Sequence, residues 1–153
     1  MSPVALDSNI LVYLAGVSRA PDDDAKIERC REIVELVGRR ATLVAPVQAL
    51  GELFIVVRRA GGSNAEAREI VSRFARALTP AATDERTIQS ACDLATDHRF
   101  QFWDALIVSA AVHAGCALLL SQDMQDGFVT RGLTIANPLA TSPQPALATL
   151  LSP

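Results

Sequence analysis

The chain has 153 residues; half of them are apolar, a fifth are charged, and the formal net charge is −3. This length and composition predict one globular core and exclude a disordered chain. The acidic balance argues against a protein that binds nucleic acid through a generic basic surface. The three cysteines are odd in number and far apart from one another, so neither a zinc site nor a disulfide framework is expected, and a reducing, cytoplasmic location is favoured.

The first half of the chain alternates short apolar runs with helical patterns. Residues 4–6 predict a short strand, and the Asp7-Ser8-Asn9 sequence that follows is good N-cap chemistry for a helix reaching Leu14. After a polar loop, the apolar spacing predicts, in order, a helix over 25–37, a buried strand over 42–45 and a helix over 47–60.

The second half continues the same alternation. Ser63 and Glu66 form a capping box for a helix reaching about Leu78, and Asp84 caps a further helix that a short strand at 81–82 could precede. The uncharged stretch 105–122 is interrupted by His113 and Gly115, and it predicts a buried helix and then a strand rather than a membrane span. The remaining elements are a helix opened by Asp104, strands over 118–120 and 133–136, and a surface tail with at most one short helix over 146–151.

Strands that alternate with helices predict an α/β fold. The expected architecture is a three-layer α/β/α sandwich with a central, mostly parallel twisted sheet. We assign residues 1–137 to this domain and residues 138–153 to a C-terminal tail that is rich in Ser, Pro and Ala.

Four acidic residues stand at the edge of, or inside, otherwise apolar segments: Asp7, Glu52, Asp104 and Asp123. Removing a carboxylate from water costs free energy unless a cation or hydrogen bonds compensate for it. Asp7 and Asp123 follow two predicted strands. Glu52 lies one turn into its helix and Asp104 lies in the first turn of another, so topology places all four acids at the carboxyl edge of the sheet, where ligands collect.

A shared divalent cation would explain all four acids together. Oxygen ligands without Cys or His indicate Mg²⁺ or Mn²⁺ rather than zinc. Carboxylate-bound Mg²⁺ keeps several waters, which suit the hydrolysis of a phosphodiester bond.

Each acid also has a simpler explanation. Asp7 could be only an N-cap, Asp104 could only complement its helix dipole, and Glu52 could pair with Arg58 or Arg59. Trp103 is expected to pack beneath Asp104 rather than to stack on a base.

Two other functions are open. One is a Mg²⁺-dependent phosphatase or phosphotransfer module with Asp7 as the nucleophile, although Asn9 stands where such enzymes need a second acid. The other is a catalytically inactive, nuclease-like interaction protein.

The motifs Leu6-Asp7-Ser8-Asn9, the helical Glu52, Trp103-Asp104-Ala105-Leu106-Ile107 and Leu120-Ser121-Gln122-Asp123 resemble the PIN-domain nucleases. The likeness is greatest to VapC-type toxins of type II toxin–antitoxin pairs, and it covers roughly residues 3 to 137. It implies an endoribonuclease that depends on Mg²⁺ or Mn²⁺, forms homodimers and is neutralised by a cognate antitoxin protein.

The resemblance also implies roles for single residues. Asp7, Glu52, Asp104 and Asp123 become catalytic metal ligands, directly or through water. Ser8, Asn9 and Ser121 become supporting polar groups that orient them. Asp126 is a second acid near the fourth position, and it is either a ligand or a residue of the turn before Gly127.

Overall fold

The computed structural model describes residues 2–153 and contains one six-stranded sheet. The strand order is β3-β2-β1-β4-β6-β5, in which β5 runs antiparallel to β6 and every other neighbouring pair is parallel. The strands are β1 (Val4–Leu6), β2 (Leu43–Pro46), β3 (Thr79–Ala81), β4 (Leu118–Leu120), β5 (Val129–Thr130) and β6 (Leu133–Ala136). The mostly parallel α/β fold predicted from the sequence is therefore confirmed.

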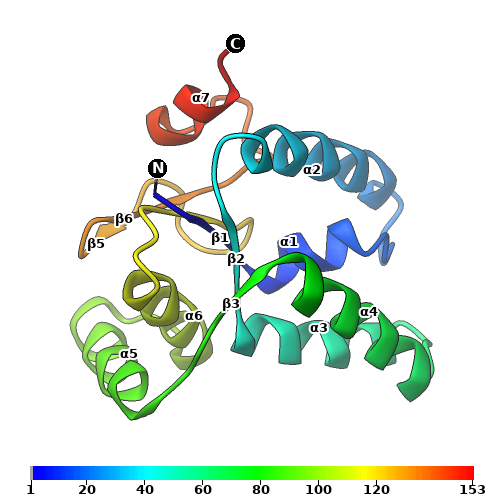
Figure 1. Cartoon of the computed structure of the whole chain (residues 1–153), viewed down its shortest axis with the longest axis horizontal. Coiled ribbons are helices and arrows are strands. Elements are labelled where there is room, and N and C mark those ends of the chain that lie inside the picture. Colours follow the sequence, from blue (N-terminus) through cyan, green and yellow to red (C-terminus); the bar gives the residue numbers. More distant parts are fainter. Residues whose placement is uncertain (1) are drawn as a thin grey trace.

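Helices flank the sheet on both faces. They are α1 (Ser8–Leu14), α2 (Asp23–Gly38), α3 (Val47–Arg59), α4 (Asn64–Ala77), α5 (Glu85–His98), α6 (Phe102–His113) and α7 (Pro145–Leu151). Figure 1 shows α1 to α4 on one side of the strands and α5 with α6 on the other. This division follows from right-handed crossovers, because the chain moves from β1 towards β3 through the first four helices and returns to β4 through the next two.

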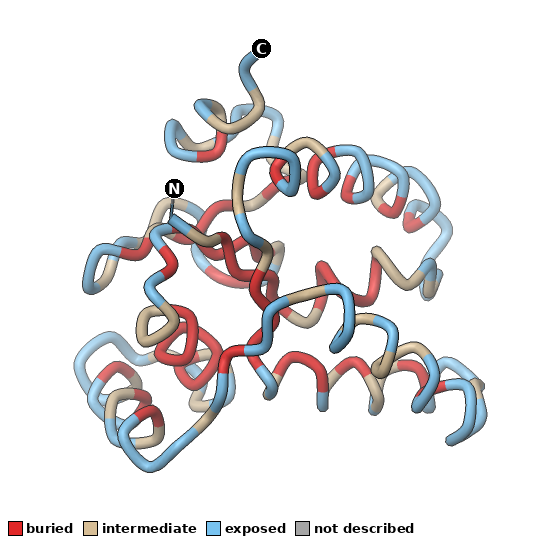
Figure 2. The backbone as a smooth tube through the Cα atoms, viewed as in Figure 1, coloured by how far each residue is buried: buried red, intermediate tan, exposed pale blue. Residues whose placement is uncertain are grey.

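The core lies along the two central strands. Every residue of β1 and of β4 is buried, as strands covered by helices on both faces require. Helix α6 is apolar on almost all sides and is buried from Ala105 to Ala111, since it lies between the sheet and α5. Figure 2 shows the buried residues at the centre of the molecule and on the helix faces turned towards the strands, with exposed residues on the outer turns.

The edges of the sheet differ in detail from the sequence prediction. Strand β3 spans Thr79–Ala81 rather than 81–82, and its Pro80 is tolerated because β3 is an edge strand. The sequence did not predict β5. It pairs with β6 through a two-residue turn in which Arg131 and Gly132 both have positive φ, at 49° and 82°. Arg-Gly is not among the usual signals for such a turn, which explains why β5 was missed.

The C-terminal segment packs against the domain. Helix α7 covers part of α2, Leu147 is fully buried, and the guanidinium of Arg40 donates to the carbonyl of Leu150 at 3.3 Å. The division at residue 137 stays a prediction, but the residues beyond it contribute to the core. Between Ser2 and Pro153, no helix is both long enough and apolar enough to span a bilayer.

Candidate active site

The centre of the site is Asp7, which stands directly after β1 and begins α1. Its side chain is 2 % exposed. Its Oδ1 accepts from the backbone N–H of Ser8 at 2.7 Å, and its Oδ2 accepts from the Ser121 hydroxyl at 2.7 Å. The backbone N–H of Asp7 also donates to the carbonyl of Leu120 in the neighbouring β4, at 2.9 Å. The carboxylate is therefore held rigidly between the ends of two adjacent parallel strands.

Asn9 joins the two strand ends. Its Nδ2 donates to Oδ2 of Asp7 and to Oδ2 of Asp123, both at 3.2 Å, and its Oδ1 accepts from the backbone N–H of Gln122 at 3.1 Å. One amide thus brings two carboxylates separated by more than a hundred residues to the same place. Asp123 is exposed, and Asn9 is its hydrogen-bond donor among the residues described.

The other two acids reach the same edge from helices. Asp104 lies in the first turn of α6, where its backbone N–H is capped by Oε1 of Gln101 at 3.1 Å. Glu52 lies in the second turn of α3, and its Oε1 accepts a long hydrogen bond of 3.4 Å from Gln48. Both side chains are half-buried.

The charges of these acids act on one another. Burial raises the pKa of Asp7 to about 6, the hydrogen bonds from Ser121 and Ser8 oppose this rise, and the charges of Asp104 and Glu52 add to it. Burial also raises the pKa of Asp104, and the charges of Glu52 and Asp123 raise it further. Mutual repulsion of this kind requires the four carboxylates to share one region of the molecule.

The donor set fits a hard divalent cation. In residues 2–153, neither carboxylate oxygen of Asp104 accepts a hydrogen bond, and Asp123 and Glu52 each accept only one, so oxygen lone pairs remain available. Oxygen atoms of this type are the ligands that Mg²⁺ and Mn²⁺ prefer. The side chains do not, however, converge on a common point as closely as bound ligands do, since residues 2–153 contain no group of three or more acidic, His or Cys side chains in metal-binding geometry.

The structure supports neither the alternative partner of Glu52 nor the expected packing of Trp103. Glu52 has no arginine partner among the described ion pairs, and Arg58 instead donates to the carbonyl of Gly62 at 2.6 Å. Trp103 is not packed beneath Asp104; it is 50 % exposed, because it sits on the solvent side of the first turn of α6. An edge-on contact with the Phe102 ring, with centroids 5.1 Å apart, holds the indole in this position.

Asp126 is engaged elsewhere. Its Oδ1 accepts from the backbone N–H of Asn137 at 2.8 Å, and its Oδ2 accepts from Nε2 of Gln144 at 3.0 Å. It is not among the charges that raise the pKa of Asp7 or Asp104. The structure therefore places Asp126 as a link to the C-terminal segment.

Sequence reasoning did not identify the support behind the loop after β4. The Tyr13 hydroxyl donates to Oε1 of Gln122 at 2.6 Å, and the Ser121 hydroxyl accepts from the backbone N–H of Met124 at 3.2 Å. These bonds fix the short segment that carries Asp123. A tyrosine on the buried face of a helix gives no sequence signal for this role.

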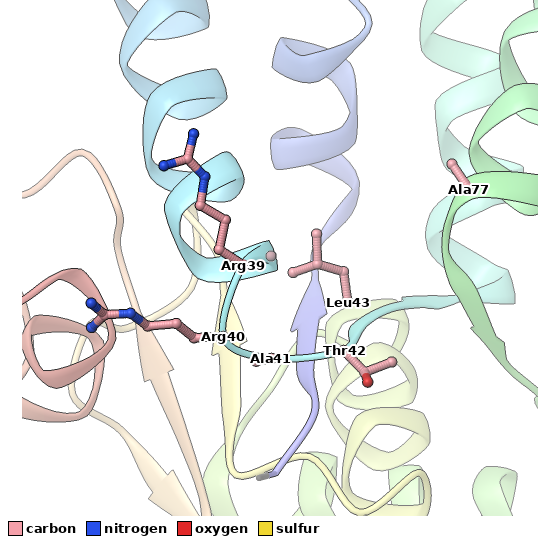
Figure 3. Close-up of a pocket in the computed structure, with 7 residues that line it drawn as sticks. Arg39, Arg40, Ala41, Thr42, Leu43 and Ala77 are labelled. Carbon is pink, nitrogen blue, oxygen red and sulfur yellow. The ribbon is translucent and has the colours of Figure 1, made fainter. Parts of the chain in front are cut away.

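Two of the surface hollows bear on where a ligand could bind. The larger, of about 560 Å³, lies at the amino edge of the sheet between the end of α2 and Ala77. Figure 3 shows that Arg39 and Arg40 point away from each other there, Arg40 towards α7, so no charges converge on the space. The smaller, of about 390 Å³, is lined by Ser8, Glu52, Arg59 and Trp103 and adjoins the acidic cluster. Only the second lies where ligands collect in such sheets.

The chain is thus an α/β protein of the class that binds its ligands at the carboxyl ends of parallel strands, and its acidic cluster lies at that edge. Comparison with known families is more specific: the PIN domain matches residues 4–125, and the chain belongs to this family. No curated protein matches the sequence.

Solved structures give the same fold. The sarcin-ricin loop cleaving toxin VapC20 of Mycobacterium tuberculosis is 12 % identical with a TM-score of 0.62, and the match covers 76 % of this chain and 86 % of that one. A chain of the Rickettsia felis VapBC2 complex bound to promoter DNA is 17 % identical with a TM-score of 0.66, covering 88 % and 97 %. A chain of the DNA-bound VapBC of Salmonella typhimurium is 17 % identical with a TM-score of 0.65, covering 90 % and 99 %.

Proposed function

We propose that the chain is a metal-dependent endoribonuclease that hydrolyses RNA phosphodiester bonds, and that it is the toxin of a toxin–antitoxin pair. The observation that carries this proposal is that Asp7, Glu52, Asp104 and Asp123 all lie at the carboxyl edge of a PIN-type sheet. Four carboxylates this close repel one another, and a divalent cation would relieve that repulsion.

Asp7, Asp104 and Asp123 would hold the cation, with Glu52 acting directly or through water. A bound Mg²⁺ or Mn²⁺ would supply an activated water and neutralise charge that develops on the phosphate. The chain's own residues then have distinct tasks. Ser121 and the Ser8 N–H fix Asp7, and Asn9 fixes Asp123 relative to it. Asp7 and Asp123 would thus be fixed relative to each other. Asp104 and Glu52, which lie on separate helices, would supply the remaining ligands.

The phosphotransfer alternative is disfavoured by the surroundings of Asp7. Asn9 occupies the position where a second acid would be needed, and its amide bridges two carboxylates instead.

The partners follow from the family resemblance. We expect a homodimer in the cytoplasm and a cognate antitoxin whose C-terminal segment lies across the acidic cleft. The VapBC structures of Rickettsia felis and Salmonella typhimurium are of toxin–antitoxin assemblies, which supports the second expectation. Co-expression with the product of the neighbouring reading frame tests it: a short DNA-binding protein that copurifies and suppresses RNA cleavage is the expected result.

The enzymatic proposal is tested by Asp104→Asn, with Asp126→Asn as the matched control. Loss of a metal ligand is expected to slow RNA cleavage in Mg²⁺ or Mn²⁺ by a factor on the order of a hundred or more. The control should retain cleavage, because Asp126 contacts the C-terminal segment. Equal cleavage by wild type and Asp104→Asn would refute the mechanism. A wild type that neither cleaves RNA nor binds Mn²⁺ would indicate an inactive nuclease-like protein.

A further inference from the structure

The loop that carries Asp123 has no regular structure of its own. Residues 121–125 form neither helix nor strand. Asp123 is exposed, and among the residues described its carboxylate accepts one hydrogen bond, from Asn9 at 3.2 Å. Asp104 and Glu52 are carried by helices, and Asp7 begins one. Asp123 is therefore the acid whose position depends most on contacts made by its loop.

Tyr13 makes the shortest contact between α1 and this loop. Its hydroxyl donates to Oε1 of Gln122 at 2.6 Å. Asn9, one turn earlier on the same helix, accepts from the backbone N–H of Gln122 at 3.1 Å. Residues four apart lie on one face of a helix, so both side chains meet the loop from the same side. Gln122, the residue before Asp123, is thus held at its backbone by Asn9 and at its side chain by Tyr13.

We propose that Tyr13 is a positioning residue of the metal site: through Gln122, its hydroxyl holds Asp123 where a divalent cation binds. The affinity for the cation then depends on a group that touches neither the cation nor the substrate. The inference rests on the proposed function and adds to it a determinant of the metal affinity. Groups that orient metal ligands from outside the coordination shell act in this way.

The surroundings of Tyr13 favour this role over simple packing. The side chain is 4 % exposed, yet its hydroxyl reaches the polar loop, whereas a phenylalanine would fill the same space without a hydrogen bond. Burial raises the pKa of Tyr13; the charge of Lys26 opposes this rise, and the charges of Asp23 and Asp123 add to it. The phenol therefore stays protonated and remains a donor to Gln122.

The side chain of Gln122 has no second anchor. In the part of the chain that the structure describes, Tyr13 supplies the only hydrogen bond to its amide group, and the residue is half-buried. Without the hydroxyl, the amide is free to turn towards water, and the loop keeps two longer hydrogen bonds with Asn9, at 3.1 and 3.2 Å. Asp123 would then occupy a wider range of positions, and metal binding would weaken because it must first order the loop.

Titration calorimetry with Mn²⁺ on the full chain measures this effect, using wild type, Tyr13→Phe and the control Thr87→Val. Tyr13→Phe removes the hydroxyl and keeps the ring. We expect its affinity for Mn²⁺ to fall about tenfold, the lower limit of the usual effect of groups that orient metal ligands, because Tyr13 acts through Gln122.

The control removes a comparable group at a distance from the site. Thr87 is also buried, and its hydroxyl donates to Asp84 at 2.8 Å. It contacts His113, which lies at the other end of α6 from Asp104. Thr87→Val should therefore lower the stability of the protein and leave the affinity for Mn²⁺ unchanged.

Amide hydrogen exchange in EDTA separates a local effect from a general loss of stability, and it requires no metal. Leu119, in the middle of the buried strand β4, is the internal reference. In Tyr13→Phe, the backbone N–H of Gln122 should exchange about 2- to 10-fold faster relative to that of Leu119, the equivalent of one hydrogen bond. In Thr87→Val, this ratio should stay as in wild type.

The route through Gln122 is tested by removing the acceptor. In Gln122→Leu, the Tyr13 hydroxyl has lost its partner, so adding Tyr13→Phe should change the affinity for Mn²⁺ by less than about twofold. A loss as large as in the wild-type background would show that the hydroxyl does not act through Gln122, and it would overturn the inference.

The outcomes separate this inference from the proposed function. Equal affinity for Mn²⁺ in wild type and Tyr13→Phe, both of which cleave RNA, overturns the inference, and the nuclease stands. An equal loss of affinity in Thr87→Val, or exchange that quickens as much at Leu119 as at Gln122, assigns the effect to general stability and also overturns it. If Tyr13→Phe weakens Mn²⁺ binding but wild type cleaves no RNA, the nuclease fails and the positioning role stands.

Discussion

The buried carboxyl of Asp7 makes the stability of the metal-free protein depend on pH. Its pKa is about 6 in the folded chain and 3.8 in the unfolded chain, mainly because of burial. Between these two values the folded chain holds a proton that the unfolded chain has lost. Protonation therefore stabilises the fold: this contribution is fully present below pH 3.8 and is lost as the pH rises through 6.

The magnitude follows from the difference in pKa. A shift of one unit corresponds to about 1.4 kcal/mol, so a rise from 3.8 to about 6 means that the ionised form destabilises the fold by about 3 kcal/mol at neutral pH. Asp7→Asn removes the charge and keeps the volume. It also replaces one carboxylate oxygen, an acceptor, by an amide NH₂ group, a donor. Because Oδ2 of Asp7 accepts from Ser121 and Asn9, this change costs about 1 to 2 kcal/mol of stability at any pH.

The assay is urea unfolding of wild type and Asp7→Asn in EDTA between pH 4 and pH 7.5. The free energy of unfolding of the variant minus that of wild type should rise by about 2.5 kcal/mol across this range. Taking the difference cancels the contribution of His113 to the pH dependence. Burial lowers the pKa of His113, so this residue destabilises the fold at acidic pH equally in both proteins. A difference that stays constant with pH would refute the reasoning that Asp7 is a buried, ionisable acid.

Three further changes probe the same structure. Glu52→Gln removes a charge that raises the pKa of Asp7, so carbon NMR titration should find that pKa lowered towards 3.8; an unchanged value would mean that the two groups are not coupled. Asn9→Ala removes the donor shared by two carboxylates and should lower the free energy of unfolding by about 1 to 3 kcal/mol at pH 7, whereas a neutral effect would show that the bridge is not maintained. Leu147→Ala should cost about 2 to 5 kcal/mol in urea unfolding, and no loss would indicate that α7 is not packed on the core.

The sequence predicted the acidic edge because its logic is topological. Asp7 and Asp123 follow apolar runs that become adjacent parallel strands, and Glu52 and Asp104 lie in early turns of helices that start at the same edge. Strand alternation alone places such residues together. The capping residues Ser63 and Asp84 were predicted for a similar reason, because their chemistry is local.

The sequence could not predict the direction of the Trp103 side chain or the distant partners of Asp126. Trp103 is next to Asp104 in the sequence, but residues adjacent in a helix point about 100° apart, so the two side chains face different surroundings. Periodicity could not place Trp103 because α6 is apolar on almost every side. The partners of Asp126 lie 11 and 18 residues away, in a segment with no repeating pattern. Long-range contacts of this kind are fixed by tertiary packing, which local patterns do not encode.

We propose that acids from four separate segments of the chain share a divalent cation. Titration calorimetry with Mn²⁺ at pH 7.5 tests it directly, using wild type, Asp104→Asn and the Asp126→Asn control. We predict Mn²⁺ binding that Asp104→Asn loses and Asp126→Asn retains. Wild type without detectable binding at millimolar Mn²⁺, or equal binding by all three proteins, would contradict the account.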